Sequence, residues 1–405
     1  MDIRESTKLK RDKTINLNKY LSLYYNELTN NVIPFWENNS LDADYGGYFT
    51  CLDRKGKVFD TDKFMWLQGR QIYMFSLIYN QIEKKQSWLD TALLGADFVK
   101  KYGRDSSGNW YFSLTREGKP LIQPYNIFSD CFMAMGGFGE LYKATGNKEH
   151  KEIALNTYYN IIKRKENPKG IYSKIIPETR PIKNFSLPMI LSNLALILED
   201  IIGNQEVDNL LYPLIKEITE SFYQQDKGLI FENILSDGTL SDSFEGRLIN
   251  PGHVIEAMWF LMDIGERFSN KELIDFAVKN TLHTIEYGWD KEHGGIFYFL
   301  DYKGYPPQQL EWDQKLWWVH IETLIALVKG YYLTENQECA KWFEIIHNYT
   351  WKHFKDNEYP EWYGYLNRQG EVLLNLKGGK WKGCFHVPRG LFQIYKTISD
   401  NQNTL

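Results

Sequence analysis

The chain has 405 residues, of which 43% are hydrophobic and 24% are charged, a balance typical of a folded globular protein and unlike that of a disordered chain. Its formal net charge of −5 provides no basic excess for binding nucleic acid or an anionic membrane surface. The four cysteines form no Cys-x-x-Cys pair, which argues against a zinc knuckle or a disulfide scaffold, and no apolar run is long enough to span a bilayer.

The first segment, residues 1–17, is polar and lacks the apolar core of a secretory signal peptide, so we expect a cytoplasmic protein. Aromatic residues make up 16% of the chain. A core of helix–helix contacts accounts for most such residues, but aromatic faces also pack against the C–H faces of pyranoses. The composition leaves both roles open.

A short motif recurs along the chain at intervals of about 60 residues, which indicates a repeated structural unit. Each copy has a turn containing glycine, then a few aromatic or β-branched residues, and a second glycine follows most copies. This pattern predicts a short β-hairpin. The six copies begin at Asp44, Asp105, Pro168, Asp226, Asp290 and Asp356, and the one at Pro168 is the weakest.

Helical patterns fill the intervals, with one segment before and one after each hairpin. The segments before the hairpins are 17–35, 87–102, 148–164, 207–224, 270–287 and 336–353, and those after them are 64–82, 125–145, 186–202, 250–268, 315–333 and 383–398. The second set is the more apolar, which predicts inner helices surrounded by outer ones. We therefore expect an all-α fold, an (α/α)6 barrel with short β-hairpins at one end, formed by residues 1–405 as a single domain.

Each hairpin leads directly into an inner helix, so all six inner helices should begin at the same end of the barrel. Unpaired N–H groups and the positive ends of the helix dipoles make that end favourable for developing negative charge. The starts of four inner helices carry reactive or aromatic side chains, namely Arg70, His253, Glu256, His320, Glu322, Trp381, His386 and Arg389.

His253 and Glu256 are three residues apart and share a helix face, so Glu256 is expected to orient the imidazole and raise its basicity. His386 and Arg389 repeat this spacing. His320 and Glu322 are two residues apart, so either one faces the site and the other the wall, or the first turn is irregular. The remaining histidines lie in outer segments or a hairpin and are expected to be structural. No His-Glu-x-x-His motif or paired-histidine spacing is present, so no metal is expected.

Three blocks, residues 60–70, 250–257 and 383–389, resemble the N-acylglucosamine 2-epimerase (renin-binding protein) family, and the resemblance runs from about residue 20 to the C-terminus. It implies an (α/α)6 barrel that interconverts the amino sugars N-acetylglucosamine and N-acetylmannosamine. It also implies ATP as an activator that is not consumed, and a homodimer. The sequence contains no phosphate-binding Gly-x-x-x-x-Gly-Lys-Ser/Thr motif, so it does not locate an ATP site.

The resemblance also implies roles for individual residues. The paired catalytic histidines of the family correspond to His253 and His386, its arginines to Arg70 and Arg389, its site glutamate to Glu322, and the carboxylate one turn after the first histidine to Glu256. Asn184, His320 and Trp381 are further candidate substrate contacts. The related cellobiose 2-epimerases and sugar isomerases typically carry another histidine where this chain reads Asn184-Phe-Ser-Leu-Pro-Met189, and its absence favours the N-acylhexosamine branch.

Epimerisation at C2 needs the open-chain aldehyde, because the C2 proton is acidic only beside a carbonyl. One histidine would remove this proton from one face and the other would return a proton to the opposite face; an imidazole pKa of about 6.5 suits both tasks. Alternatives remain open: a cellobiose or mannose 2-epimerase or an aldose–ketose isomerase on the same barrel, an inverting glycosidase using Glu256 and Glu322, and a purely binding protein.

Overall fold

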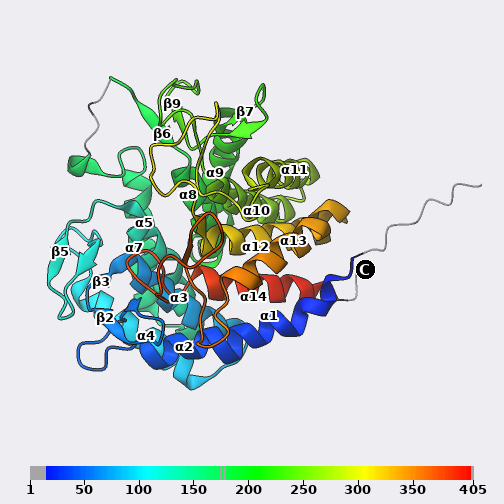
Figure 1. The fold of residues 1–405 in the computed structure, drawn as a ribbon. Coiled ribbons are helices and arrows are strands. Elements are labelled where there is room, and N and C mark those ends of the chain that lie inside the picture. Colours follow the sequence, from blue (N-terminus) through cyan, green and yellow to red (C-terminus); the bar gives the residue numbers. More distant parts are fainter. Residues whose placement is uncertain (1–14, 174–175, 177–178, 403–405) are drawn as a thin grey trace, which may run out of the picture.

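The computed structural model describes residues 15–173, 176 and 179–402. Its helices form two sets, which Figure 1 shows as an inner group surrounded by an outer one. The inner set is α3 (Met65–Gln81), α5 (Ile127–Phe132) continued by the π-helical η3 (Met133–Glu140) and by α6 (Leu141–Thr145), α8 (Ser186–Ile202), α10 (Pro251–Arg267), α12 (Trp317–Thr334) and α14 (His386–Asp400). The outer set is η1 (Leu17–Tyr20), α1 (Leu21–Glu27), η2 (Leu28–Val32) and α2 (Ile33–Asn39), then α4 (Gln86–Tyr102), α7 (Lys148–Arg164), α9 (Asn204–Lys216) with η5 (Glu217–Phe222), α11 (Lys271–Gly288) and α13 (Gln337–His353).

This arrangement confirms the expected (α/α)6 barrel, and each predicted helical segment corresponds to one member of the two sets. Helix α12 is buried on all sides over most of its length, whereas α4 buries one face only, as expected for inner and outer helices. The ring closes where the C-terminal helix α14 packs against the N-terminal helix α1, which lie side by side in Figure 1.

The inner helices approach one another closely at glycines. Gly390 of α14 faces Ile321 of α12, and a Cβ added at Gly390 would lie 2.1 Å from the side chain of Ile321. Only a residue without a side chain fits there, because protein interiors are packed without spare volume. The close contact fixes the start of α14 relative to the start of α12.

The short strands link neighbouring units. The strand before an inner helix pairs antiparallel with the hairpin of the next unit: β3 (Lys63–Phe64) with β4 (Ser113–Leu114), β6 (Ile182–Asn184) with β9 (Asn233–Leu235), β10 (Leu248–Ile249) with β11 (Leu300–Asp301), and β12 (Lys315–Leu316) with β13 (Tyr365–Leu366). The remaining strands, β1 (Cys51–Leu52) with β2 (Val58–Asp60), β5 (Pro120–Ile122) with β4, and β7 (Tyr223–Gln224) with β8 (Leu229–Ile230), form the local hairpins. The hairpins are therefore also connectors that join the helix starts into a ring.

The prediction of a third hairpin, at Pro168–Tyr172, is wrong. Residues Gly170–Tyr172 form a single 3₁₀ turn, η4, and the strand that follows, β6, pairs with the fourth unit instead. The motif was weakest there because it lacks the second glycine turn that closes a hairpin.

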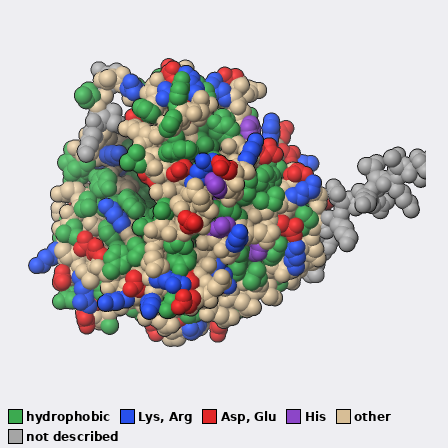
Figure 2. Space-filling model, viewed as in Figure 1, with side chains coloured by type: hydrophobic (Ala, Val, Ile, Leu, Met, Phe, Trp, Pro, Cys, Tyr) green, Lys and Arg blue, Asp and Glu red, His purple; other side chains and the backbone are tan. Residues whose placement is uncertain are grey.

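The surface carries no dominant sign of charge on the face shown in Figure 2, where acidic and basic side chains are interspersed. None of the helices among the described residues is both long and apolar enough to cross a membrane. The four cysteines are all buried and free.

Candidate active site

The starts of α3, α10, α12 and α14 bring six of the predicted residues into one cluster around the carboxylates of the site. The strands β10 and β12 lead directly into α10 and α12 and fix where these helices begin. Asn250 caps α10 by accepting the backbone N–H of His253 at 3.2 Å. The residues that come together are Arg70, His253, Glu256, Glu322, His386 and Arg389.

Glu322 is the centre of the hydrogen-bond network. Its Oε1 accepts from His386 Nδ1 at 2.7 Å and from Arg389 Nη2 at 2.6 Å, and its Oε2 accepts from Trp259 Nε1 at 2.9 Å. A carboxylate only accepts hydrogen bonds, so Nδ1 of His386 carries a proton and the neutral imidazole has its lone pair on Nε2. Glu322 thus holds His386 in the tautomer that a base at Nε2 requires.

Arg389 connects the two carboxylates of the cluster. Its Nη2 donates to Glu256 at 2.5 Å and to Glu322 at 2.6 Å. Glu256, Glu322 and His386 bring their ligand atoms within 4.8 Å of one another, a spacing that would also suit a metal ion. The guanidinium of Arg389 lies between the two carboxylates and supplies one of the positive charges that balance them.

His253 pairs with Glu232, a residue that the sequence analysis missed. Nδ1 of His253 lies 3.0 Å from both carboxylate oxygens of Glu232. The expectation that Glu256 orients His253 is wrong, because Glu256 is bound to Arg389 instead. Helical spacing reveals only neighbours on the same helix, whereas Glu232 comes from the loop between β8 and β9 of the fourth hairpin.

Asn184 and Trp381 are both exposed. Asn184 donates through Nδ2 to Glu232 Oε1 at 3.2 Å, which places it beside the His253 pair. Trp381 packs edge-on against Trp66, with ring centroids 5.4 Å apart. Asn184 therefore lies near His253, and Trp381 lies near Arg70, because Trp66 contacts both Trp381 and Arg70.

His320 is not available to a substrate, which corrects its expected role. It is fully buried, its Nδ1 donates to the carbonyl of Leu316 at 2.7 Å, and its Nε2 accepts the backbone N–H of Ile296 at 3.0 Å. Burial lowers the pKa of His320 to about 3, so it stays neutral. Of the two residues at this helix start, Glu322 therefore faces the site and His320 fixes the wall.

Arg70 is held by aromatic rings. Its guanidinium lies 4.1 Å from the ring centroid of Phe132, 4.4 Å from that of Trp66 and 4.5 Å from that of Phe385. Within residues 15–173, 176 and 179–402 it has no hydrogen-bond or ion-pair partner, although the side chain is almost fully buried. Burial, together with the nearby Arg389, lowers the pKa of Arg70 to about 9. A buried, unpaired guanidinium is costly, and its placement suits an oxygen that gains negative charge during a reaction.

The two histidines differ in electrostatic surroundings although both face the indole of Trp318, with ring centroids 5.4 Å (His253) and 5.8 Å (His386) from it. Burial opposes a charge on His253, but Glu232 and Glu256 outweigh burial and raise its pKa. Burial, Arg70 and Arg389 hold the pKa of His386 well below its usual value. Neither Nε2 has a protein partner among the residues described above.

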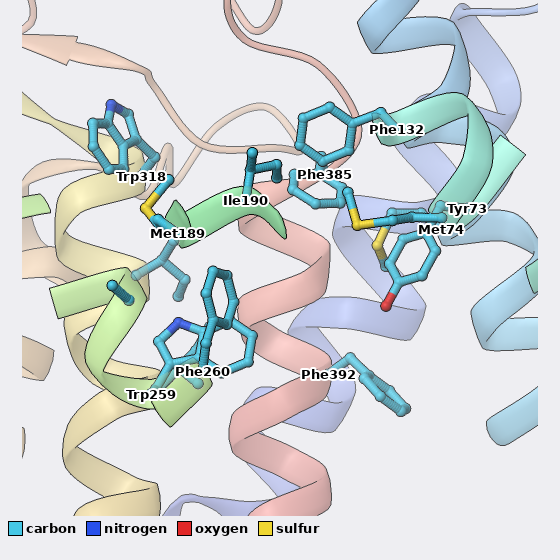
Figure 3. Close-up of a cluster of buried hydrophobic side chains, with 14 of the residues drawn as sticks. Tyr73, Met74, Phe132, Met189, Ile190, Trp259, Phe260, Trp318, Phe385 and Phe392 are labelled. Carbon is cyan, nitrogen blue, oxygen red and sulfur yellow. The ribbon is translucent and has the colours of Figure 1, made fainter. Parts of the chain in front are cut away.

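An apolar layer surrounds this polar cluster. Figure 3 shows Phe132 and Phe385 close together, with Tyr73 beside them and Trp259 and Phe260 farther along the barrel. The rings of Phe132 and Phe385 pack edge to face at 5.2 Å. Because Arg70, Arg389 and Glu322 are all buried, their charges interact more strongly than they would in solvent.

Comparison with known proteins places this geometry in a family. Residues 47–387 match the N-acylglucosamine 2-epimerase (GlcNAc 2-epimerase) family. The chain is 38% identical to N-acylglucosamine 2-epimerase from Mus musculus, over 89% of this chain and 87% of that protein, and 37% identical to that from Homo sapiens, over 89% and 86%. The solved structure of cellobiose 2-epimerase from Spirochaeta thermophila shares the fold, with a TM-score of 0.81, 18% identity and coverage of 98% of this chain and 100% of that one.

The family model matches most of the chain and the identity to its curated members exceeds 30% over most of both sequences, which confirms the resemblance inferred from residues 60–70, 250–257 and 383–389. The fold agrees independently, because cellobiose 2-epimerases have the same barrel. The chain belongs to the N-acylglucosamine 2-epimerase family.

Proposed function

We propose that this protein is a sugar 2-epimerase that interconverts N-acetyl-D-glucosamine and N-acetyl-D-mannosamine. The observation that carries the proposal is the pair of histidines, His253 and His386. Each is bound through Nδ1 to a carboxylate, and the Nε2 of each has no partner within the described part of the chain. The identity of 37–38% to N-acylglucosamine 2-epimerases supports N-acetylhexosamines as substrates. No bond to a cofactor is made or broken in this reaction, so none is consumed.

The reaction begins with the open-chain aldehyde. Nε2 of one histidine takes the C2 proton, and the C2–H electron pair moves toward the C1 carbonyl to give an enediolate. The other histidine then donates a proton from its Nε2 to the opposite face of C2, which restores the aldehyde with inverted configuration. A positioned general acid or base of this kind typically contributes a factor of about 10²–10⁴ to the rate.

Arg70 and Arg389 are assigned to the charge that develops on the C1 oxygen. The guanidinium of Arg70 is fixed between rings and has no carboxylate of its own among the described residues, so it is free to bind an oxyanion. Preorganised donors in a dry site cost little reorganisation at the moment of reaction. Glu256 and Glu322 hold Arg389 and His386, while Asn184 and Trp381 are assigned to the sugar hydroxyls and ring face.

The family resemblance adds two finer expectations to this proposal, namely that ATP acts as an allosteric activator and that the protein forms a homodimer; a cytoplasmic location is a separate part of the proposal. ATP takes no part in the chemistry, because proton exchange at C2 balances without a phosphate group. Activity measured with and without ATP, together with the mass of the protein in solution, tests the two expectations.

The deciding experiment is proton NMR of the purified protein with N-acetylmannosamine in D₂O, with and without ATP. We expect N-acetylglucosamine carrying deuterium at C2, because the proton that is returned comes from an imidazole that exchanges with solvent. Wild-type protein without sugar and sugar without protein serve as controls.

Other outcomes would contradict the substrate assignment in a defined way. Inactivity on N-acetylmannosamine combined with conversion of cellobiose or mannose would keep the two-histidine chemistry and move the protein to a neighbouring branch. Formation of a ketose would indicate an aldose–ketose isomerase, in which the enediol is reprotonated at C1.

A further inference from the structure

We infer that Glu232 is the positioning residue of His253 and keeps the resting proton of the catalytic pair on His253, so that His386 is the free base in the substrate-free protein. The inference deepens the proposed function and rests on its two-histidine reaction. It assigns a role to a carboxylate outside the inner helices and an order to the two bases.

The geometry of Glu232 is that of a dedicated partner. Both of its carboxylate oxygens lie 3.0 Å from Nδ1 of His253, and its side chain is only 8% exposed. The amide of Asn184 donates to Oε1 at 3.2 Å and to the Glu232 carbonyl at 3.4 Å, which holds the carboxylate in place. In the part of the chain that the structure describes, no lysine or arginine forms an ion pair with Glu232.

The carboxylate of the second histidine has a different environment. Glu322 shares Arg389 with Glu256, and Arg70 lies close to the same cluster. Two carboxylates and two guanidinium groups balance one another there before His386 binds any proton. The pair of His253 and Glu232, by contrast, carries one unbalanced negative charge while the imidazole is neutral.

A proton on His253 therefore neutralises a buried charge, whereas a proton on His386 adds a third positive group beside Arg70 and Arg389. The groups that face His253 are Glu232 from the hairpin, Glu256 on its own helix, the uncharged indole of Trp318 on α12, and the positive groups of α3 and α14 beyond it. The directions of the pKa shifts, raised for His253 and lowered for His386, agree with this count.

The consequence for the reaction is an order of events. The epimer that presents its C2 proton to His386 meets a ready base on one side and a protonated His253 on the other. After turnover the proton taken from C2 lies on Nε2 of His386, and His253 has given its proton to C2. The resting state returns when His386 releases its proton to solvent and His253 takes one up.

The test compares the wild-type protein with Glu232→Gln, which keeps an acceptor oxygen for Nδ1 but removes the charge. NMR of protein labelled at histidine Cε1 follows the titration of His253 without any substrate, and His253→Asn identifies its signal. We expect the pKa of His253 to fall by about one to three pH units in Glu232→Gln, the range typical of losing an adjacent opposite charge. Glu245→Gln, an exposed carboxylate in the same hairpin, is the matched control and should leave the titration unchanged.

A kinetic measurement separates this role from a merely structural one. In Glu232→Gln the alkaline limb of the pH profile of kcat/KM should move to lower pH. The shift should be the same for both directions of the epimerisation, because the equilibrium constant between the two sugars does not depend on pH. A structural role would lower kcat/KM without moving the limb.

An unchanged His253 titration in Glu232→Gln would overturn the inference, as would a resting proton found on His386. Wild-type protein that exchanges no C2 proton in D₂O would instead contradict the proposed function. Because the titration uses substrate-free protein, the two failures are distinguishable.

Discussion

Arg54 binds the carboxylate of Asp356 with two hydrogen bonds, at 2.7 Å from Nε and 2.9 Å from Nη2, although 302 residues separate them in the chain. Lys377 donates to the same carboxylate at 2.9 Å. Arg54 lies in the hairpin of the first unit and Asp356 in that of the last. This contact therefore closes the ring of hairpins at the end of the barrel that carries the site.

The same arrangement occurs twice more. In each copy an aspartate at a hairpin turn accepts hydrogen bonds from a fully buried lysine of its own unit and from an arginine of the next unit. The other two copies are Asp42 with Lys63 and Arg116, and Asp290 with Lys315 and Arg368. Three repeated contacts thus hold neighbouring units in register where the helix starts must converge.

We expect Asp356→Asn to lower the free energy of unfolding by about 3 kcal/mol, because it leaves the ammonium of Lys377 buried without its counter-ion. Chemical denaturation followed by circular dichroism measures this loss. Asp400→Asn removes the partner of Lys396 in an exposed ion pair and should cost less than about 0.5 kcal/mol. Equal losses in the two variants would mean that the buried contact does not stabilise the ring.

The same contacts predict acid sensitivity. Burial would raise the pKa of Asp42, but hydrogen bonds from Arg116 and Lys63 outweigh burial and lower the pKa to about 2. The pKa values of Asp290 and Asp356 are also lowered, by Arg368 and Arg54 respectively. A carboxyl whose pKa is lower in the folded state stabilises the fold above its unfolded pKa of about 3.9 and loses this contribution as the pH falls.

We therefore expect the free energy of unfolding to fall from about pH 4 toward pH 2, the window set by the unfolded value and by Asp42. Urea titrations at several pH values measure the slope. In Asp42→Asn the slope should be shallower, since one of the responsible groups is gone. A slope identical to that of the wild type would exclude Asp42 as a source of the acid sensitivity.

The helices were predictable because their apolar periodicity is local and repeated six times, and the inner and outer sets differ in composition. Glu322, His386 and Arg389 were also predictable as neighbours, because all lie at inner-helix starts and the ring geometry brings these starts together. The pairing of β3 with β4 and of β6 with β9 was not predictable, because a strand of two or three residues has no sequence pattern that indicates its partner.

The site was predicted less completely, because contacts between different units leave no pattern along one helix. Helical spacing assigned Glu256 to His253, yet Glu256 binds Arg389 across the barrel and Glu232 takes its place from a hairpin. His320 looked reactive at a helix start, but its ring nitrogens satisfy backbone groups that the strands leave unpaired. Contacts between units depend on the closed ring, which spacing along one helix does not describe.

His386→Asn should reduce the rate of C2 deuterium exchange by a factor of about 10²–10⁴, because the side chain loses the nitrogen that acts as the base. The fold should persist, because the amide still reaches the network around Glu322. The NMR assay in D₂O measures the rate. His283→Asn, on the exposed face of the outer helix α11, is the control and should exchange at the wild-type rate.

Activity within twofold of wild type in His386→Asn would remove His386 from the mechanism. Loss of activity in His283→Asn would show that histidine substitutions act through the fold, and the comparison would then carry no information about the site.

Gly252→Ala should lower kcat strongly and the free energy of unfolding only slightly. A Cβ at Gly252 would lie 2.5 Å from Cη2 of Trp318, the indole that both catalytic-pair histidines face. The ring must shift, and a small misplacement of reacting groups reduces the rate strongly. Gly379→Ala, where a Cβ would meet nothing within 4 Å, is the control. Steady-state kinetics that do not distinguish the two variants would contradict a positioning role for Trp318.

Arg70→Met is expected to separate activity from stability. Methionine keeps the length and apolar contacts of the side chain among Phe132, Trp66 and Phe385 but removes the buried, unpaired guanidinium. Stability should be retained or increased, because removing an unpaired buried charge relieves its desolvation cost. The value of kcat should fall by about 10²–10³-fold if Arg70 stabilises the enediolate.

Arg267→Met provides the opposite case. Arg267 at the end of α10 pairs with Glu199 at 2.7 Å and with Asp208 at 2.5 Å, far along the helix from the site. Its loss should lower the melting temperature and leave kcat close to the wild-type value. Differential scanning calorimetry and the exchange assay measure the melting temperature and the rate for both variants. A lower melting temperature in Arg70→Met, with kcat unchanged, would make Arg70 a structural residue. Stabilisation of the enediolate oxygen would then be assigned to Arg389 and the helix N-termini.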